Sequence, residues 1–149
     1  MIDLWLAIAH HVLAFGLVAM LATELAMVRP GMSSVDALRA ARIDAGYGAS
    51  AGLIIAAGLL RIYFGAKGVD YYLFNVWFWA KLAAFAAMGI ASVAPTIRFI
   101  AWRNAARKHP GFVPPPGDIG RVRMFLGMET ALLGAILTLA ATMARYTDY

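Results

Sequence analysis

The residues with the clearest capacity for chemistry are two adjacent histidines, His10 and His11, inside a long apolar run. The run covers residues 4–28 and holds one other ionisable side chain, Glu24. A helix of about 25 residues rising about 1.5 Å per residue is long enough to cross the hydrocarbon core of a bilayer. Ionisable groups at that depth are costly and usually face a bundle interior or a cofactor. The two histidines are therefore candidate functional residues.

Helical geometry places His10 and Glu24 on one face of this first apolar run. They are 14 residues apart in the sequence, so at about 100° per residue their side chains differ by about 40°. Leu17 and Leu21 lie on the same stripe. His11 points about 100° away from His10, so we expect only His10 to face an inner partner. The simpler interpretation of His10 is a hydrogen bond between helices.

Composition indicates a membrane protein. The chain has 149 residues, of which 62% are hydrophobic and 14% charged, with a mean hydropathy of +0.73. A soluble domain has roughly 45–50% apolar and about 25% charged residues, so most of this surface is expected to face lipid. There is no cysteine, which excludes disulfides, thiolate metal sites and iron–sulfur clusters. Because the basic residues lie between apolar runs, the net charge of +5 does not indicate a nucleic-acid partner.

Four apolar runs predict an all-α integral membrane protein, a four-helix bundle forming one domain over residues 1–149. The first run lacks the positive n-region of a signal peptide and is interpreted as a retained span. Sequential helices joined by short connections should be antiparallel neighbours. The expected spans are residues 4–28, 43–64, 76–100 and 122–145.

The segments around the second span carry secondary signals. We expect a short amphipathic helix over residues 37–42 at the membrane surface and a turn over residues 65–68. Gly48 and Gly52 have the GxxxG spacing that lets two helices approach closely. Four aromatic residues predict a belt at the membrane–water boundary. They are Tyr71, Tyr72, Trp77 and Trp79.

The distribution of basic residues predicts orientation. Nine of the 13 Lys and Arg residues fall in or beside the loops after the first and third spans. The positive-inside rule places those loops in the cytoplasm and both termini outside. The remaining four basic residues are Arg61, Lys67, Lys81 and Arg145.

Helix rise predicts two polar layers. His10 and Lys81 should lie at matching depth, roughly 8–10 Å below the outer boundary, with Arg61 and Arg145 near the outer ends of their spans. Snorkelling to the interface is the alternative role of these cations. The other layer is expected to pair three carboxylates with three guanidinium groups, in a structural or a functional role. Its members are Glu24, Asp44 and Glu129 with Arg98, Arg121 and Arg123.

Haem b is the cofactor that these residues suit best. A zinc cage lacks ligands, and a copper–thioether site built from Met residues ranks last. Haem needs one or two axial nitrogens, an apolar slot and cations near its propionates. His10 and Lys81 are the candidate axial ligands of the haem iron, and Arg61 or Arg145 the candidate propionate partners.

The chain resembles, over nearly its whole length, a bacterial domain-of-unknown-function family of small four-span inner-membrane proteins. The resemblance implies a location in the bacterial inner membrane, where termini placed outside by the positive-inside rule would be periplasmic, and it brings no assigned activity. The stretches that carry it are the run Leu4 to Leu25, Asp44, Gly58-Leu59-Leu60-Arg61, Gly65-Ala66-Lys67-Gly68, Tyr71-Tyr72-Leu73, Asn75, Phe78-Trp79-Ala80-Lys81, Arg98 and Trp102-Arg103.

More distantly, the pattern is similar to the haem-containing membrane protoporphyrinogen oxidases and the copper-resistance membrane proteins related to them. Trp5 with His10, the segment Trp79-Ala80-Lys81-Leu82 and the segment from Arg123 to Glu129 carry this similarity. It implies that His10 and Lys81 are linked to haem. Residues 19–22 depart from the oxidase pattern, so a haem pocket could be shared without the oxidase reaction.

Two functional interpretations remain open at this point, and neither decides whether the protein is an enzyme. In the first, the protein binds haem b between its helices and has a redox or porphyrin-related role. In the second, it is a non-catalytic accessory or scaffold subunit, with membrane lipids and either a larger membrane complex or a second copy as partners. Ion handling through Met and His ranks third.

Overall fold

Five helices make up the computed structural model, which describes residues 1–65 and 68–146. Four of them are long and apolar enough to cross a membrane, and no strand occurs within the described ranges. The prediction of an all-α four-helix membrane bundle is confirmed. The helices are α1 (Ile2–Met27), α2 (Ser34–Phe64), α3 (Gly68–Leu73), α4 (Val76–Lys108) and α5 (Pro116–Arg145).

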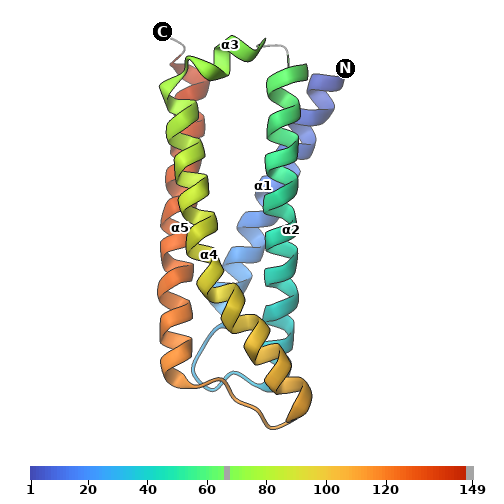
Figure 1. Ribbon diagram of the computed structural model, residues 1–149, viewed down its shortest axis with the longest axis vertical. Helices are drawn as coiled ribbons and strands as arrows, with labels where there is room; N and C mark the ends of the chain where they lie inside the picture. The colour runs from blue at the N-terminus through green and yellow to red at the C-terminus, as the bar shows by residue number, and fades with distance from the viewer. Residues whose placement is uncertain (66–67, 147–149) are drawn as a thin grey trace.

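The four long helices form two antiparallel pairs. Helix α1 packs along α2, and α4 packs along α5. The two pairs are joined mainly by α2 with α4 and less extensively by α1 with α5. Both ends of the chain lie at one end of the bundle, which we call the terminal end, and α3 crosses that end between α2 and α4 (Figure 1). The connections α1–α2 and α4–α5 lie at the opposite end, the loop end.

Helix α2 begins earlier than expected. Ser33 and Asp36 form a capping box, in which the Ser33 hydroxyl accepts from the Asp36 N–H at 3.2 Å and the Asp36 carboxylate accepts from the Ser33 N–H at 3.3 Å. From there the helix continues without a break to Phe64. The separate surface helix over residues 37–42 was therefore a wrong prediction, because nothing between these residues and the span interrupts the backbone hydrogen bonds.

Helix α4 changes direction near its middle, where its loop-end half crosses towards α2 (Figure 1). Pro95 lies in this helix and lacks the N–H that would bond to the carbonyl four residues earlier, which is a common cause of a kink. At its start, the Asn75 side chain accepts from the Trp77 and Phe78 N–H groups at 2.9 and 3.3 Å. The bend lets α4 accompany α5 at one end and meet α2 at the other.

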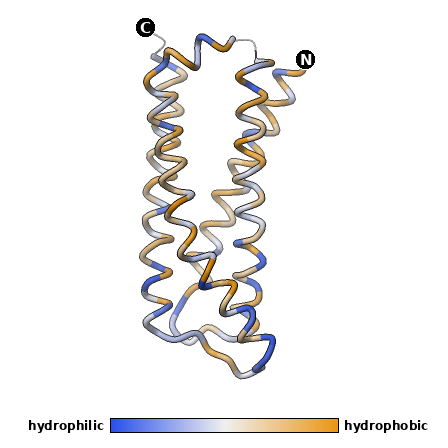
Figure 2. Tube along the Cα trace, in the orientation of Figure 1, coloured by the Kyte–Doolittle hydropathy of each residue, from blue (hydrophilic) through white to orange (hydrophobic). Residues whose placement is uncertain are grey.

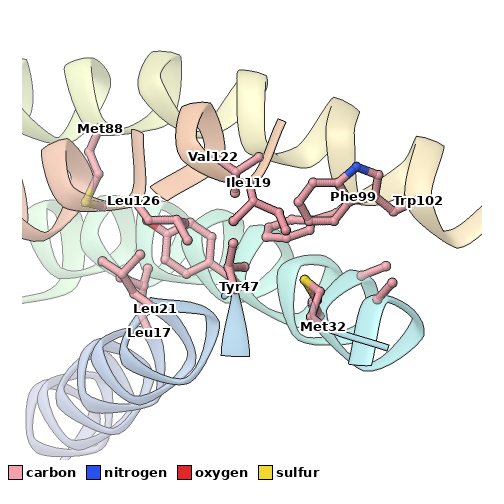
Figure 3. Close-up of a cluster of buried hydrophobic side chains, with 14 residues drawn as sticks. Leu17, Leu21, Met32, Tyr47, Met88, Phe99, Trp102, Ile119, Val122 and Leu126 are labelled. Carbon is pink, nitrogen blue, oxygen red and sulfur yellow. The ribbon is translucent and has the colours of Figure 1, made fainter. Parts of the chain in front are cut away.

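Packing is densest towards the loop end. Leu17 and Leu21 of α1 meet Leu126 of α5 there, and Phe99 packs edge-to-face on Trp102 with ring centroids 5.5 Å apart (Figure 3). Hydrophilic residues gather mainly at the two ends of the bundle (Figure 2). The outward faces carry many exposed large apolar side chains, as expected of a surface that meets lipid.

One expectation about helix contacts needs correction. Gly48 and Gly52 have no atom within 4 Å of a built Cβ position, so their GxxxG spacing brings no other described helix close. Gly46 is the residue at the α1–α2 contact, because a Cβ there would lie 3.1 Å from the Met20 sulfur. Spacing alone does not say which side of a helix faces its neighbour.

The predicted aromatic belt divides into two groups. Trp77 and Trp79 are exposed, whereas Tyr71 and Tyr72 are buried. The Tyr71 hydroxyl donates to the Met143 carbonyl of α5 at 2.9 Å, which fixes α3 across the terminal end. Of the turn expected over residues 65–68, residues 66 and 67 lie outside the described ranges.

Candidate functional site

A cavity of about 560 Å³ lies between the two helix pairs at the terminal end. All five helices contribute to its wall, which is mainly apolar and includes Phe15, Ile54, Phe85 and Leu133. It forms where the pairs stand apart and α3 covers them (Figure 1). Its size is within the roughly 300–1,000 Å³ of small-molecule and cofactor sites.

His10 is the polar group most directly available to a ligand in this cavity. Its ring lines the cavity, and its Nδ1 is buried without a hydrogen-bond partner in the described part of the chain. Buried polar atoms are normally paired, so this nitrogen is an exception that suits a ligand. Gly58 of α2 lies beside the ring, since a Cβ built on it would be in ordinary van der Waals contact with the His10 Cε1 at 4.0 Å.

His11 lies at the margin of the same cavity but is exposed, and its Nδ1 donates to the Ala7 carbonyl at 2.6 Å. The two imidazole rings are 6.3 Å apart and nearly perpendicular. The adjacent pair is therefore divided as expected, with His10 facing inwards and His11 hydrogen-bonded to a carbonyl of its own helix.

Two cations line the cavity together with His10. They are Arg61 near the end of α2 and Lys81 near the start of α4, and both lie close enough to interact electrostatically with the imidazole. The Lys81 Nζ lies 5.7 Å from the centroid of the Phe78 ring, and the Arg61 Nε is buried without a hydrogen-bond partner. No Asp or Glu is among the cavity-lining residues of the described chain. The cavity therefore carries positive charge and suits an anionic group.

Arg145 is placed differently from the other candidate residues. It is exposed at the end of α5, and the cavity wall there is formed by its neighbours Met143 and Ala144. Sequence reasoning also missed Tyr71 and Tyr72 as cavity residues. In the sequence, Asn75 indicates where α4 begins, but no local pattern indicates that α3 lies across the end of the bundle.

The predicted layer of three carboxylates and three guanidinium groups does not form, because the three arginines lie elsewhere. Arg98 pairs with Asp118 at 3.4 Å, and Arg123 donates to the Val28 and Leu25 carbonyls at 2.6 and 3.2 Å. Arg121 is exposed. The predicted pairing of these guanidinium groups with the buried carboxyl groups is therefore wrong, because similar depth does not place side chains on the same face.

The three carboxyl groups of that layer form a buried carboxyl cluster, made of Glu24, Asp44 and Glu129. The Tyr47 hydroxyl reaches from α2 to Glu129 Oε2 on α5 at 2.8 Å, and the Thr96 hydroxyl of α4 donates to Asp44 Oδ1 at 2.8 Å. Tyr47 lies among the core side chains of the loop-end half (Figure 3). No group of three or more His, Cys, Asp or Glu residues with metal-binding geometry occurs in the part searched, residues 1–65 and 68–146.

Comparison with known proteins places this arrangement in one family. No curated protein and no solved structure matches the chain. A family model described as "Predicted membrane protein (DUF2214)" matches residues 2–146, nearly the full length of the four-span bundle. The chain therefore belongs to this family of predicted membrane proteins.

Proposed function

We propose that the protein binds haem b in the cavity at the terminal end and has a redox or porphyrin-related role in the membrane. The observation that carries this proposal is His10, whose ring lines an apolar cavity and whose buried Nδ1 lacks a partner in the described chain. Haem requires an axial nitrogen and an apolar slot between helices. Both are supplied by residues of this one site.

The charges around the cavity support the same ligand. Haem is a flat apolar ring with two anionic propionates, so its pocket needs cations at one edge. Arg61 and Lys81 line the cavity without a neighbouring carboxyl group in the described wall. A ligand with an apolar body and acidic groups would satisfy both the wall and these cations.

Each residue has a distinct task in this proposal. His10 would hold the haem iron through its imidazole, and Arg61 would bind a propionate. Lys81 would either hold the iron as well or serve as a further cation of the cavity. The haem supplies electron transfer, while the bundle tunes it through ligand identity and burial. Arg145 has no role in it, since it lies outside the cavity wall.

We further propose that the protein lies in the bacterial inner membrane with both termini in the periplasm. The structure brings both termini to one end (Figure 1), and most basic residues belong to the segments at the loop end. The positive-inside rule then assigns the loop end to the cytoplasm, so the cavity would lie in the periplasmic half of the bilayer.

The test is an absorbance spectrum of the detergent-purified protein after expression with haem supply. We expect a Soret band that His10→Ala abolishes or weakens at least about tenfold at equal protein, because a lost axial ligand costs several kcal/mol of binding. His11→Ala is the matched control and should retain the band. Lys81→Met should shift the band if Lys81 is a ligand, and weaken it without a shift if Lys81 is only a pocket cation.

Two results would contradict this proposal. One is a Soret band unchanged by His10→Ala. The other is a folded, colourless preparation that copurifies with a larger complex, which would favour the accessory-subunit interpretation.

A further inference from the structure

The buried carboxyl cluster is a second group of ionisable side chains, and the proposed haem site does not include it. Glu24 and Glu129 are each 1% exposed and Asp44 is 6% exposed. In residues 1–65 and 68–146, the single ion pair is Arg98–Asp118, so no lysine or arginine neutralises the cluster. Three ionised carboxylates held together without a counter-charge would repel each other strongly inside a membrane protein.

The hydrogen bonds of the cluster indicate which member can carry a proton. Glu129 accepts from Tyr47 and Asp44 accepts from Thr96, and accepting a donor suits an ionised carboxylate. Glu24 receives no hydrogen bond from any described residue, and its Oε1 is buried without a partner. The Oε1 of Glu129 is likewise buried and without a partner. Within the described chain, Glu24 therefore has no hydrogen-bond donor, and Glu129 has one oxygen that accepts no hydrogen bond.

We propose that Glu24 is protonated in the folded protein, so that the cluster is an exchangeable proton-binding site within the membrane. A proton on Glu24 removes one negative charge from a cluster that no described lysine or arginine pairs with. A metal ion is the weaker occupant, because the described residues include no group with metal-binding geometry.

The site joins helices of both pairs. Glu24 comes from α1, Asp44 and Tyr47 from α2, Thr96 from α4 and Glu129 from α5. Two arginines on the same helices are engaged elsewhere, Arg123 with backbone carbonyls and Arg98 with Asp118. Loss of the proton would leave like charges facing each other across the contact between the pairs.

The cluster is separate from the cavity. Along α1, the buried apolar residues Leu17 and Leu21 lie between His10 and Glu24. Glu24, Asp44 and Glu129 are not among the described residues that line the cavity, so variants of the cluster and variants of the cavity change different residues. Buried acidic residues of this kind mark proton-binding steps in many membrane proteins.

Infrared spectroscopy of the whole protein at neutral pH tests the proposal without a variant. A protonated carboxyl group gives a C=O stretching band separate from the bands of carboxylates. We expect such a band, which shifts in D₂O and also shifts when glutamate, but not aspartate, carries ¹³C in its side-chain carboxyl group. Absence of the band, or a shift with labelled aspartate alone, would overturn the assignment to Glu24.

A matched pair of variants refines the test. Glu24→Gln keeps the shape of the acid and its ability to donate a hydrogen bond, so the protein should fold and lose the band. Asp118→Asn, which changes the ion-paired carboxylate near the loop end, should keep it. Replacing choline chloride with sodium chloride should leave the band unchanged, and its loss in sodium would overturn the proposal in favour of a bound cation.

Discussion

At the level of single residues, neighbouring side chains of the same type have opposite environments. His10 lines the cavity with an unpartnered nitrogen, whereas His11 donates to a carbonyl of its own helix. One helical step of about 100° accounts for the difference. A comparison of His10→Ala with His11→Ala is therefore informative about the cavity, because both substitutions remove the same atoms from neighbouring positions of one helix.

Tyr47 provides a residue-level prediction about the carboxyl cluster. Its hydroxyl bonds to Glu129 across the centre of the bundle, and Tyr47→Phe would remove this donor from a buried acceptor. Hydrogen bonds between membrane helices contribute about 0.6 kcal/mol on average and up to about 1.7 kcal/mol. We expect the free energy of unfolding to fall by about 1 kcal/mol in an SDS titration of the protein in mixed micelles.

Tyr63→Phe is the matched control for this substitution. Tyr63 lies on the same helix but is exposed, so the same change should alter the free energy of unfolding little. Equal effects of the two variants would show that the Tyr47–Glu129 hydrogen bond does not contribute to stability.

At the level of secondary-structure elements, a glycine matters only where its helix meets another. Gly46 of α2 faces the Met20 sulfur of α1, whereas Gly48, two residues later, faces open space. The pair α1–α2 therefore approaches through Gly46, and the GxxxG face points away from the described bundle. The bend in α4 at Pro95 is also a property of a single element, because it lets α4 pack against α5 at one end and against α2 at the other.

Gly46→Leu should weaken the α1–α2 contact. A Cβ alone would lie 3.1 Å from the Met20 sulfur, and a leucine adds three more carbon atoms at this contact. Overpacking of this kind typically costs about 1–3 kcal/mol. Gly48→Leu adds the same side chain towards lipid and gains the same helix propensity. We expect Gly46→Leu to unfold at a lower SDS fraction than Gly48→Leu, and similar midpoints would contradict the packing of α1 against α2 at this position.

At the level of the whole molecule, two helix pairs meet closely at one end and stand apart at the other. The loop-end half holds the packed core and the carboxyl cluster, and the terminal half holds the cavity. The polar contacts Tyr47–Glu129 and Thr96–Asp44 both join one pair to the other. The contacts that hold the two pairs together and the space available to a ligand therefore lie at different ends of the bundle.

The placement of the termini gives a prediction at this scale. The natural sequence has no cysteine, so single cysteines introduced by Ile2→Cys, Tyr146→Cys and Gly111→Cys report accessibility without background. All three positions are exposed. We expect a membrane-impermeant maleimide to label positions 2 and 146 in right-side-out vesicles, and position 111 only after the membrane is opened. Labelling of positions 2 and 146 from opposite sides would contradict a four-span bundle, and labelling of position 111 alone would reverse the proposed orientation.

Much of the fold was predictable because the signals are local. The four spans follow from apolar runs of sufficient length, and the matched depth of His10 and Lys81 follows from helix rise. Both residues line one cavity. The start of α2 was missed although Ser33 and Asp36 carry a capping pattern, because the span was expected to begin at the first long apolar stretch and not at the cap.

The sequence by itself determined that this is a membrane protein, that it has four membrane-spanning helices and that His10 and Glu24 share a helix face. These properties depend on side-chain hydrophobicity and on the fixed helical repeat, so each is set within one segment. Tertiary structure alone decided that Tyr71 and Tyr72 close the cavity and that Arg98, Arg121 and Arg123 turn away from the carboxyl cluster. Those outcomes depend on the rotation and tilt of helices distant in sequence, which are set by packing between them.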